Sequence, residues 1–89
     1  MKTIITVVGS DRPGIVSGIT TALYELNINI LDISQTIMGD YFTMTMLVDH
    51  AKAVKPFDEA KVRILAAGEP LGVEVRIQRV DIFDAMHSL

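Results

Sequence analysis

Residues 8–15, with the sequence Val-Gly-Ser-Asp-Arg-Pro-Gly-Ile, mark the point at which an apolar strand gives way to a helix. Ser10 or Asp11 is a suitable helix cap, and Pro13 has the backbone angle that the first helical turn requires. A helix start leaves backbone N–H groups unpaired and carries a partial positive charge. A polar loop at this place can therefore hold a carboxylate or another small anion.

The segments on either side of this loop have different periodicities. Residues 2–8 are rich in Ile, Val and Thr on both faces, which predicts a central strand covered on both sides. After the loop, apolar residues recur at helical spacing, which predicts a helix with one buried face. That face consists of Ile15, Ile19, Leu23 and Leu26, and Asn27 is expected to end the helix.

Two alternating segments follow, joined by a tight turn. Residues 30–37 place Leu31, Ile33 and Ile37 on one face and Asp32, Ser34 and Thr36 on the other. Gly39-Asp40 fits a two-residue hairpin turn with glycine at its first central position. The return strand has one apolar face, and we interpret both of its methionines as core residues: Phe42, Met44, Met46 and Val48.

A second helix and a last strand complete the pattern. Pro56 begins the helix, and Gly68 with Pro70 closes it. Its inner face is predicted to be Phe57, Ala60, Ile64 and Ala67. The last strand alternates apolar and polar residues over 73–78. A short helix is expected in the tail from Asp81, packing within the chain or against a second subunit through Ile82 or Phe83, Met86 and Leu89.

The order of elements is therefore β-α-β-β-α-β, which predicts an α+β fold. Because each helix follows a strand, both should pack on one face of a four-stranded antiparallel sheet, the ferredoxin-like sandwich. We expect one domain over residues 1–89, with a core at 1–80 and a short C-terminal tail at 81–89. The residues predicted to face the helices are Leu31, Ile33, Phe42, Met44, Met46, Val73, Val75 and Ile77.

Composition narrows the possible partners. The chain has 89 residues, of which 49% are hydrophobic, more than a small monomer easily hides, and this favours an oligomer. The net charge of −3 and the scattered Lys and Arg residues argue against nucleic acid. No apolar run approaches the length that spans a bilayer, and no signal-peptide pattern is present, so we expect no membrane contact and a cytoplasmic protein.

The sequence offers no convincing catalytic or metal-binding constellation. There is no cysteine, and His50 and His87 are isolated, so both histidines are expected at the surface. Asp32 has no second carboxylate or base placed to work with it. A phosphate-hydrolysing site built on Arg12, with Asn27 or Asn29 as the positioning amide, is a weaker alternative, because the loop lacks the glycine run that usually cradles a phosphate.

The motif Asp-Arg-Pro-Gly-Ile at 11–15, followed one helix later by Asn-Ile-Asn-Ile at 27–30, resembles the ACT domain, the small amino-acid-sensing module of metabolic regulation. The resemblance covers residues 1–80. The segment 32–37 and the ending at 81–87 more narrowly resemble the stand-alone single-ACT-domain proteins of the UPF0237 family.

This resemblance implies a homodimer that binds a small molecule, expected to be an amino acid, between two copies and without a cofactor. The first strand–helix loop of one copy would supply Ser10, Asp11, Arg12, Pro13, Gly14 and Ile15, and the start of the second strand of the other would supply Asn29, Ile30 and Leu31. The N-terminus of the first helix would receive the ligand carboxylate, and Asp11 and Asn29 would hold its ammonium and polar groups. The protein would pass the signal to a regulated protein partner. The alternative is a ligand-free protein-interaction or oligomerisation module.

Overall fold

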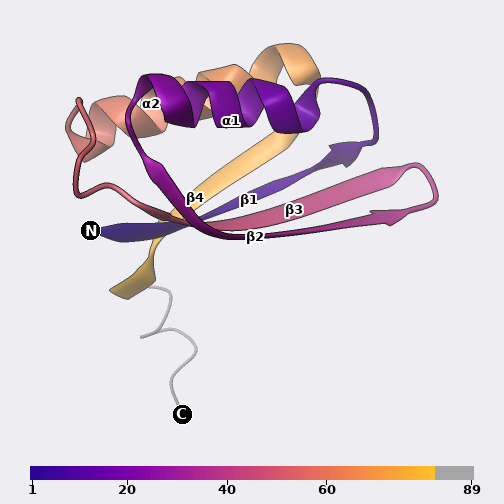
Figure 1. Cartoon of the computed structure of the whole chain (residues 1–89). Coiled ribbons are helices and arrows are strands. Elements are labelled where there is room, and N and C mark those ends of the chain that lie inside the picture. Colours follow the sequence, from indigo (N-terminus) through magenta and orange to yellow (C-terminus); the bar gives the residue numbers. More distant parts are fainter. Residues whose placement is uncertain (82–89) are drawn as a thin grey trace.

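Four antiparallel strands form one sheet in the order β2-β3-β1-β4. The computed structural model describes residues 1–81, so the predicted tail helix and His87 lie outside the described residues. The strands are β1 (Lys2–Ser10), β2 (Asn29–Met38), β3 (Tyr41–Asp49) and β4 (Glu74–Arg79). Two helices, α1 (Ile15–Glu25) and α2 (Phe57–Gly68), cover one face of the sheet, and a 3₁₀ turn, η1 (Glu69–Leu71), leads from α2 towards β4 (Figure 1). The predicted ferredoxin-like fold is confirmed.

The hydrophobic core lies between the sheet and the two helices. Every second residue of β3 is buried in it, and the predicted methionines are fully inaccessible. The apolar faces of α1 and α2 pack into the same core, as the helical spacing predicts. The core residues are Ile5, Val7, Ile15, Ile19, Leu23, Leu26, Ile28, Phe42, Met44, Met46, Val48, Ala60, Ile64 and Ile77.

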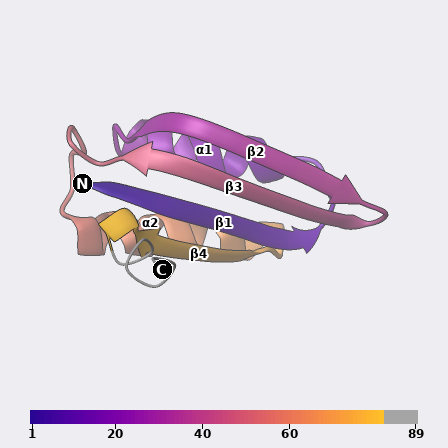
Figure 2. The same cartoon turned by 90° about the horizontal axis from the view of Figure 1, so that it is seen from below.

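Within residues 1–81, no helix covers the opposite face of the sheet (Figure 2). The prediction that β1 is covered on both sides is therefore wrong: Val8 is 41% exposed, while Ile4 and Thr6 are half-buried. An antiparallel sheet can leave one face to water, and the strands on either side of β1 shield its side chains in part. The apolar character of β1 thus reflects its central position in the sheet.

Strand β2 lies at the edge of the sheet, and two side chains predicted to face the helices are exposed for that reason. Ile33 is paired with the buried Met46 and so keeps the predicted face, but it is 44% exposed because no strand lies beyond it. Leu31 is the extra residue of an irregularity between Ile30 and Asp32, and it is 43% exposed. Edge position depends on the strand order, which the alternation along one strand does not reveal.

Candidate functional site

The loop between β1 and α1 begins later than the sequence predicted. β1 runs through Ser10, which pairs with Tyr41, and the backbone N–H of Asp11 donates a hydrogen bond of 2.7 Å to the Asp40 carbonyl of the hairpin turn. The helix starts only after Gly14, and no side chain caps it. The predicted cap at Ser10 or Asp11 is therefore wrong, because pairing with β3 holds these residues in or next to the sheet.

Gly14 has a left-handed backbone conformation, with φ of 91°. A side chain added there would meet only Leu71, at 4.0 Å, so space is available and the backbone conformation is what requires glycine. Pro13 lies in the turn that precedes the helix. Ile15 is buried in the core, so this residue offers the loop its backbone N–H group and not its side chain.

Arg12 is attached to the turn between α2 and β4. Its Nη1 atom donates a hydrogen bond of 3.2 Å to the Leu71 carbonyl. The Leu71 side chain packs on α1 where Gly18 leaves room for it, since a Cβ at Gly18 would lie 2.9 Å from Leu71 Cδ1. Arg12 thus holds the loop against η1.

The second predicted group of residues lies at the start of β2. Asn29 is exposed and directly opposite Asp49 in the β2–β3 register. Ile30 is half-buried opposite Val48. A hollow of about 470 Å³ opens here, lined by Tyr24, Asn27, Ile28, Asn29, Asp49, Ala51 and Lys52.

Asn27 shapes this hollow and ends the helix as predicted. Its φ of 57° is left-handed, a conformation that asparagine tolerates better than most residues. Its side-chain Nδ2 donates a hydrogen bond of 2.9 Å to the Lys52 carbonyl. The end of α1 is thereby tied to the segment that follows β3.

One chain does not bring the two predicted groups together. The loop precedes α1 and Asn29 follows it, so the eleven residues of the helix, roughly 16 Å of length, separate them (Figure 1). The loop lies at the end of the sheet that holds Tyr41, and Asn29 lies at the end that holds Asp49.

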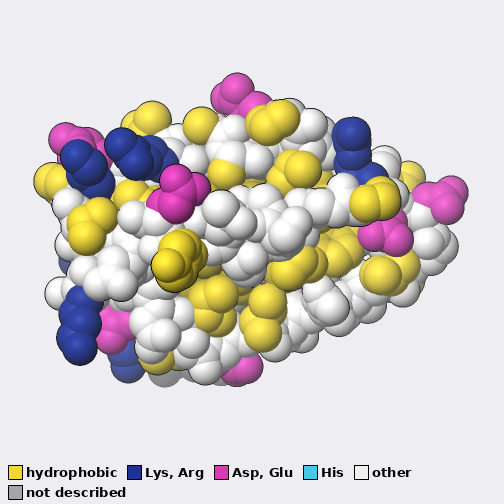
Figure 3. All heavy atoms as spheres, turned by 45° about the horizontal axis from the view of Figure 1, so that its top comes forward, with side chains coloured by type: hydrophobic (Ala, Val, Ile, Leu, Met, Phe, Trp, Pro, Cys, Tyr) yellow, Lys and Arg dark blue, Asp and Glu magenta, His cyan; other side chains and the backbone are white. Residues whose placement is uncertain are grey.

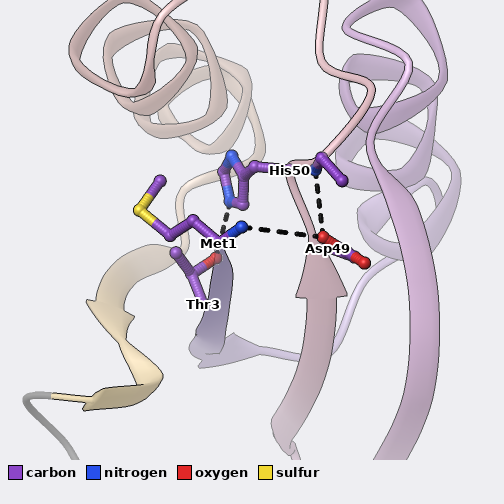
Figure 4. A network of polar contacts seen from close by, with 5 residues as sticks. Met1, Thr3, Asp49 and His50 are labelled. Carbon is purple, nitrogen blue, oxygen red and sulfur yellow. Dashed lines mark hydrogen bonds and ion pairs between the residues drawn. The ribbon is translucent and has the colours of Figure 1, made fainter.

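His50 was predicted at the surface, and this prediction is wrong. Its Nε2 atom is hydrogen-bonded to Thr3 Oγ1 at 2.8 Å (Figure 4). Its ring meets the Phe57 ring edge-on, with 5.6 Å between the ring centroids. Its Nδ1 atom is buried without a hydrogen-bond partner among residues 1–81. Burial lowers the pKa of His50, the N-terminal ammonium lowers it further, and Asp49 opposes them. The sequence held a signal for this burial, because His50 continues the period-two face that ends at Val48.

Asp32 has a local structural role. Its Oδ1 atom accepts a hydrogen bond of 2.9 Å from the Ile33 backbone at the irregular part of β2. In the described part of the chain, no group of three His, Cys, Asp or Glu residues is arranged to hold a metal ion. No helix between residues 1 and 81 has the length and apolar character to cross a membrane.

A four-stranded antiparallel sheet with both helices on one face defines the class as a ferredoxin-like α+β domain, and its first helix begins at a glycine after the first strand. The ACT domain family matches residues 2–78, and the chain belongs to this family. It is 52% identical to a UPF0237 protein of Listeria monocytogenes over 89 residues, all of both chains. It is 50% identical to a UPF0237 protein of Methanocaldococcus jannaschii over 88 residues, 99% of this chain and 98% of the relative.

A solved structure supports the same family assignment. The ACT domain protein from Streptococcus pneumoniae is 43% identical, with a TM-score of 0.80 over 94% of each chain. The family assignment confirms the resemblance found in the loop and helix-end motifs. It indicates a regulatory domain and not a catalytic family.

Proposed function

We propose that this protein is a homodimeric sensor that binds an amino acid between its two subunits. ACT domains are in general regulatory modules that bind small molecules. The observation that carries the proposal is the unpaired edge of β2, because it offers a way to join the loop of one copy to Asn29 of another.

The edge of β2 is suited to pairing with a second copy. It is ten residues long, and Asp32 is its one charged residue. Four of its apolar side chains are exposed: Leu31, Ile33, Ile37 and Met38. Edge strands that avoid pairing usually carry lysine, proline or several charges, and β2 has no lysine or proline. On the helix side, by contrast, apolar side chains are interspersed with Lys, Arg, Asp and Glu (Figure 3), which supports the strand edge as the interface over a helix face.

Antiparallel pairing of two β2 strands would bring the two predicted groups together. In a two-fold dimer, the beginning of one β2 lies beside the end of the other, so Asn29 of the second copy would lie beside Met38. Met38 leads into the hairpin turn, and the Asp40 carbonyl of that turn is bonded to Asp11. The loop and Asn29 would then border one site at each end of the interface.

The chemistry of such a site fits an amino acid. The first turn of α1 has no side-chain cap, so its N–H groups can donate to a carboxylate. Asn29 adds an amide that can both donate and accept. We expect the protein to be cytoplasmic and to act on a partner protein.

A thermal-shift screen against the standard amino acids, combined with light scattering, tests this function. An amino acid at about 100 times its dissociation constant should add roughly 2.7 kcal/mol of stability, a shift of several degrees for a domain of this size. The protein should scatter as a dimer at micromolar concentration. A stable monomer would contradict the interface site, and a dimer that responds to no amino acid would favour a ligand-free interaction module.

A further inference from the structure

The hollow beside Asn29 contains a carboxylate that is held in place and has one oxygen available. Asp49 lies at the end of β3, and its side chain is 30% exposed. Its Oδ1 atom accepts a hydrogen bond of 3.0 Å from the Ala51 backbone and lies 3.9 Å from the N-terminal ammonium. Both contacts use the same oxygen (Figure 4). The other, Oδ2, makes no hydrogen bond or ion pair within residues 1–81.

Asn29 places a second acceptor beside this carboxylate. The two residues are directly opposite in the β2–β3 register, and side chains at such positions have Cβ atoms about 4.5–5.5 Å apart. A primary ammonium has three N–H donors. The Asp49 Oδ2 and the Asn29 side-chain oxygen could accept two of them, the first as a charge-assisted hydrogen bond.

Lys52 gives the same hollow a positive group. Its backbone is fixed by the bond from Asn27, and its ammonium makes no ion pair with the described residues. In the proposed dimer, a ligand carboxylate would lie between the α1 start of one copy and Lys52 of the other. The ligand's two charges would then each have an opposite charge nearby.

Asp11, the other candidate for the ligand's ammonium, is placed less well. Its side chain is exposed and has no hydrogen bond or ion pair with the rest of the described chain. An exposed carboxylate without a hydrogen bond or ion pair contributes little to binding a cation, because water screens its charge and binding would have to immobilise its side chain. Asp49 is already held by two contacts, so less freedom is lost.

We propose that Asp49 is the residue that recognises the ligand's ammonium, with Asn29 beside it, so that the site selects primary amines over analogues that lack one. This inference rests on the proposed function and adds a specificity-determining residue to it. It predicts that a 2-amino acid binds, while the matching 2-hydroxy acid and the N-acetylated amino acid bind weakly or not at all.

Calorimetric titration of the full chain tests this inference in two ways. The first uses the wild-type protein with the amino acid that gives the largest thermal shift, its 2-hydroxy analogue and its N-acetyl derivative. The second compares Asp49→Asn with Asp11→Asn, the rival partner of the ammonium, and with Asp58→Asn, which makes the same change of charge on α2, away from the strand edge. We expect each analogue and the Asp49 variant to bind roughly tenfold more weakly or worse, the Asp11 variant to lose less affinity than the Asp49 variant, and the Asp58 variant to bind within about twofold of wild type.

The outcomes separate this inference from the proposed function. If the amino acid and its 2-hydroxy analogue bind equally, or if only Asp11→Asn weakens binding, the role of Asp49 is overturned and the amino-acid sensor stands. If no amino acid binds the wild-type protein, the proposed function itself fails. The analogue series needs no variant, so it tests the selection of primary amines even if Asp49→Asn does not fold. Asp49→Glu, which keeps the charge and displaces the carboxylate, then tests the assignment in its place: unchanged affinity in this variant together with a loss in Asp11→Asn would overturn the role of Asp49.

Discussion

His50 Nε2 and Thr3 Oγ1 lie 2.8 Å apart, in a buried hydrogen bond that joins the segment after β3 to the beginning of β1. The backbone reinforces this link, since the His50 N–H donates a bond of 2.8 Å to the Met1 carbonyl. The histidine ring is therefore part of the packing at this end of the sheet. Its ionisation should affect the stability of the fold.

Stability should fall as the pH drops below the ordinary histidine pKa of 6.5. Burial, and after it the N-terminal ammonium, lowers the pKa of His50 in the folded state. The unfolded chain then binds more protons than the folded chain between the two pKa values, so acid favours unfolding. Above pH 6.5 this contribution is fully present, and it is lost as the pH falls towards the folded-state pKa. Denaturant unfolding measured across this range checks the prediction.

The matched control for this prediction is His50→Gln, which removes the titrating group and retains a hydrogen-bonding side chain. Its stability should be lower than that of wild type at neutral pH and should vary less between neutral and mildly acidic pH. An equally steep acid dependence in the variant would place the responsible group elsewhere.

Gly14→Ala should destabilise the fold by about 1–3 kcal/mol, because the left-handed backbone at this position is unfavourable for any residue with a Cβ. The nearest atom is 4.0 Å from the added methyl group, so a steric clash would not be the cause. Urea unfolding measures the loss. Ser17→Ala, in the first turn of the helix, is the control and should change stability little, because it removes only an exposed hydrogen bond of 3.3 Å to the Gly14 carbonyl. If Gly14→Ala were as stable as wild type, the loop would have to adopt a different conformation in solution.

Arg12→Gln should loosen the loop while leaving the core intact. It removes the hydrogen bond from Nη1 to the Leu71 carbonyl, an exposed contact worth about 0.5–1.5 kcal/mol at most. Hydrogen exchange should become faster at the backbone amides of the non-proline residues in 11–14 and 69–72 and remain unchanged in β3. Unchanged exchange in both segments would show that this bond does not hold the loop.

Ile37→Lys should convert the proposed dimer into a monomer. Ile37 is 56% exposed on the edge strand, and a lysine there opposes pairing with another β2. Val62→Lys is the matched control, since Val62 is 65% exposed on α2, away from the strand edge. Light scattering should give a monomer for the first variant and a dimer for the second. The reverse result would favour an interface on the helix layer.

Regular periodicity made much of the fold predictable. The helical spacing of Ile15, Ile19 and Leu23 and the alternation along β3 each identified a buried face that the structure confirms. Gly39 has a positive φ at the tight turn, as its position in the hairpin suggested. These features depend on neighbours along the chain, which the sequence shows directly.

Features that depend on distant parts of the chain were predicted less well. α1 begins after Gly14, later than the predicted cap at Ser10 or Asp11, because β1 pairs with β3 as far as Ser10. Local capping preferences do not encode this strand pairing. The exposure of Ile33 follows from the edge position of β2. The sequence alone did not identify Asp49 as a candidate site residue, because its position in the hollow depends on its pairing with Asn29.

The central claim is that each ligand site is shared by two subunits, and a mixing experiment tests it most directly. Ser17→Glu puts a negative charge in the first turn of α1, which favours the helix and repels a ligand carboxylate. Asn29→Ala removes the amide at the start of β2. Each variant alone should fail to bind the amino acid that binds the wild-type protein.

A dimer that contains one subunit of each kind would have one intact site and one site with both defects. After the two variants are unfolded together and refolded in equal amounts, calorimetry should recover about a quarter of the wild-type binding capacity at wild-type affinity. If the mixture bound no more ligand than the separate variants, the two halves of the site would not come from different subunits, and the account given for this protein would be contradicted.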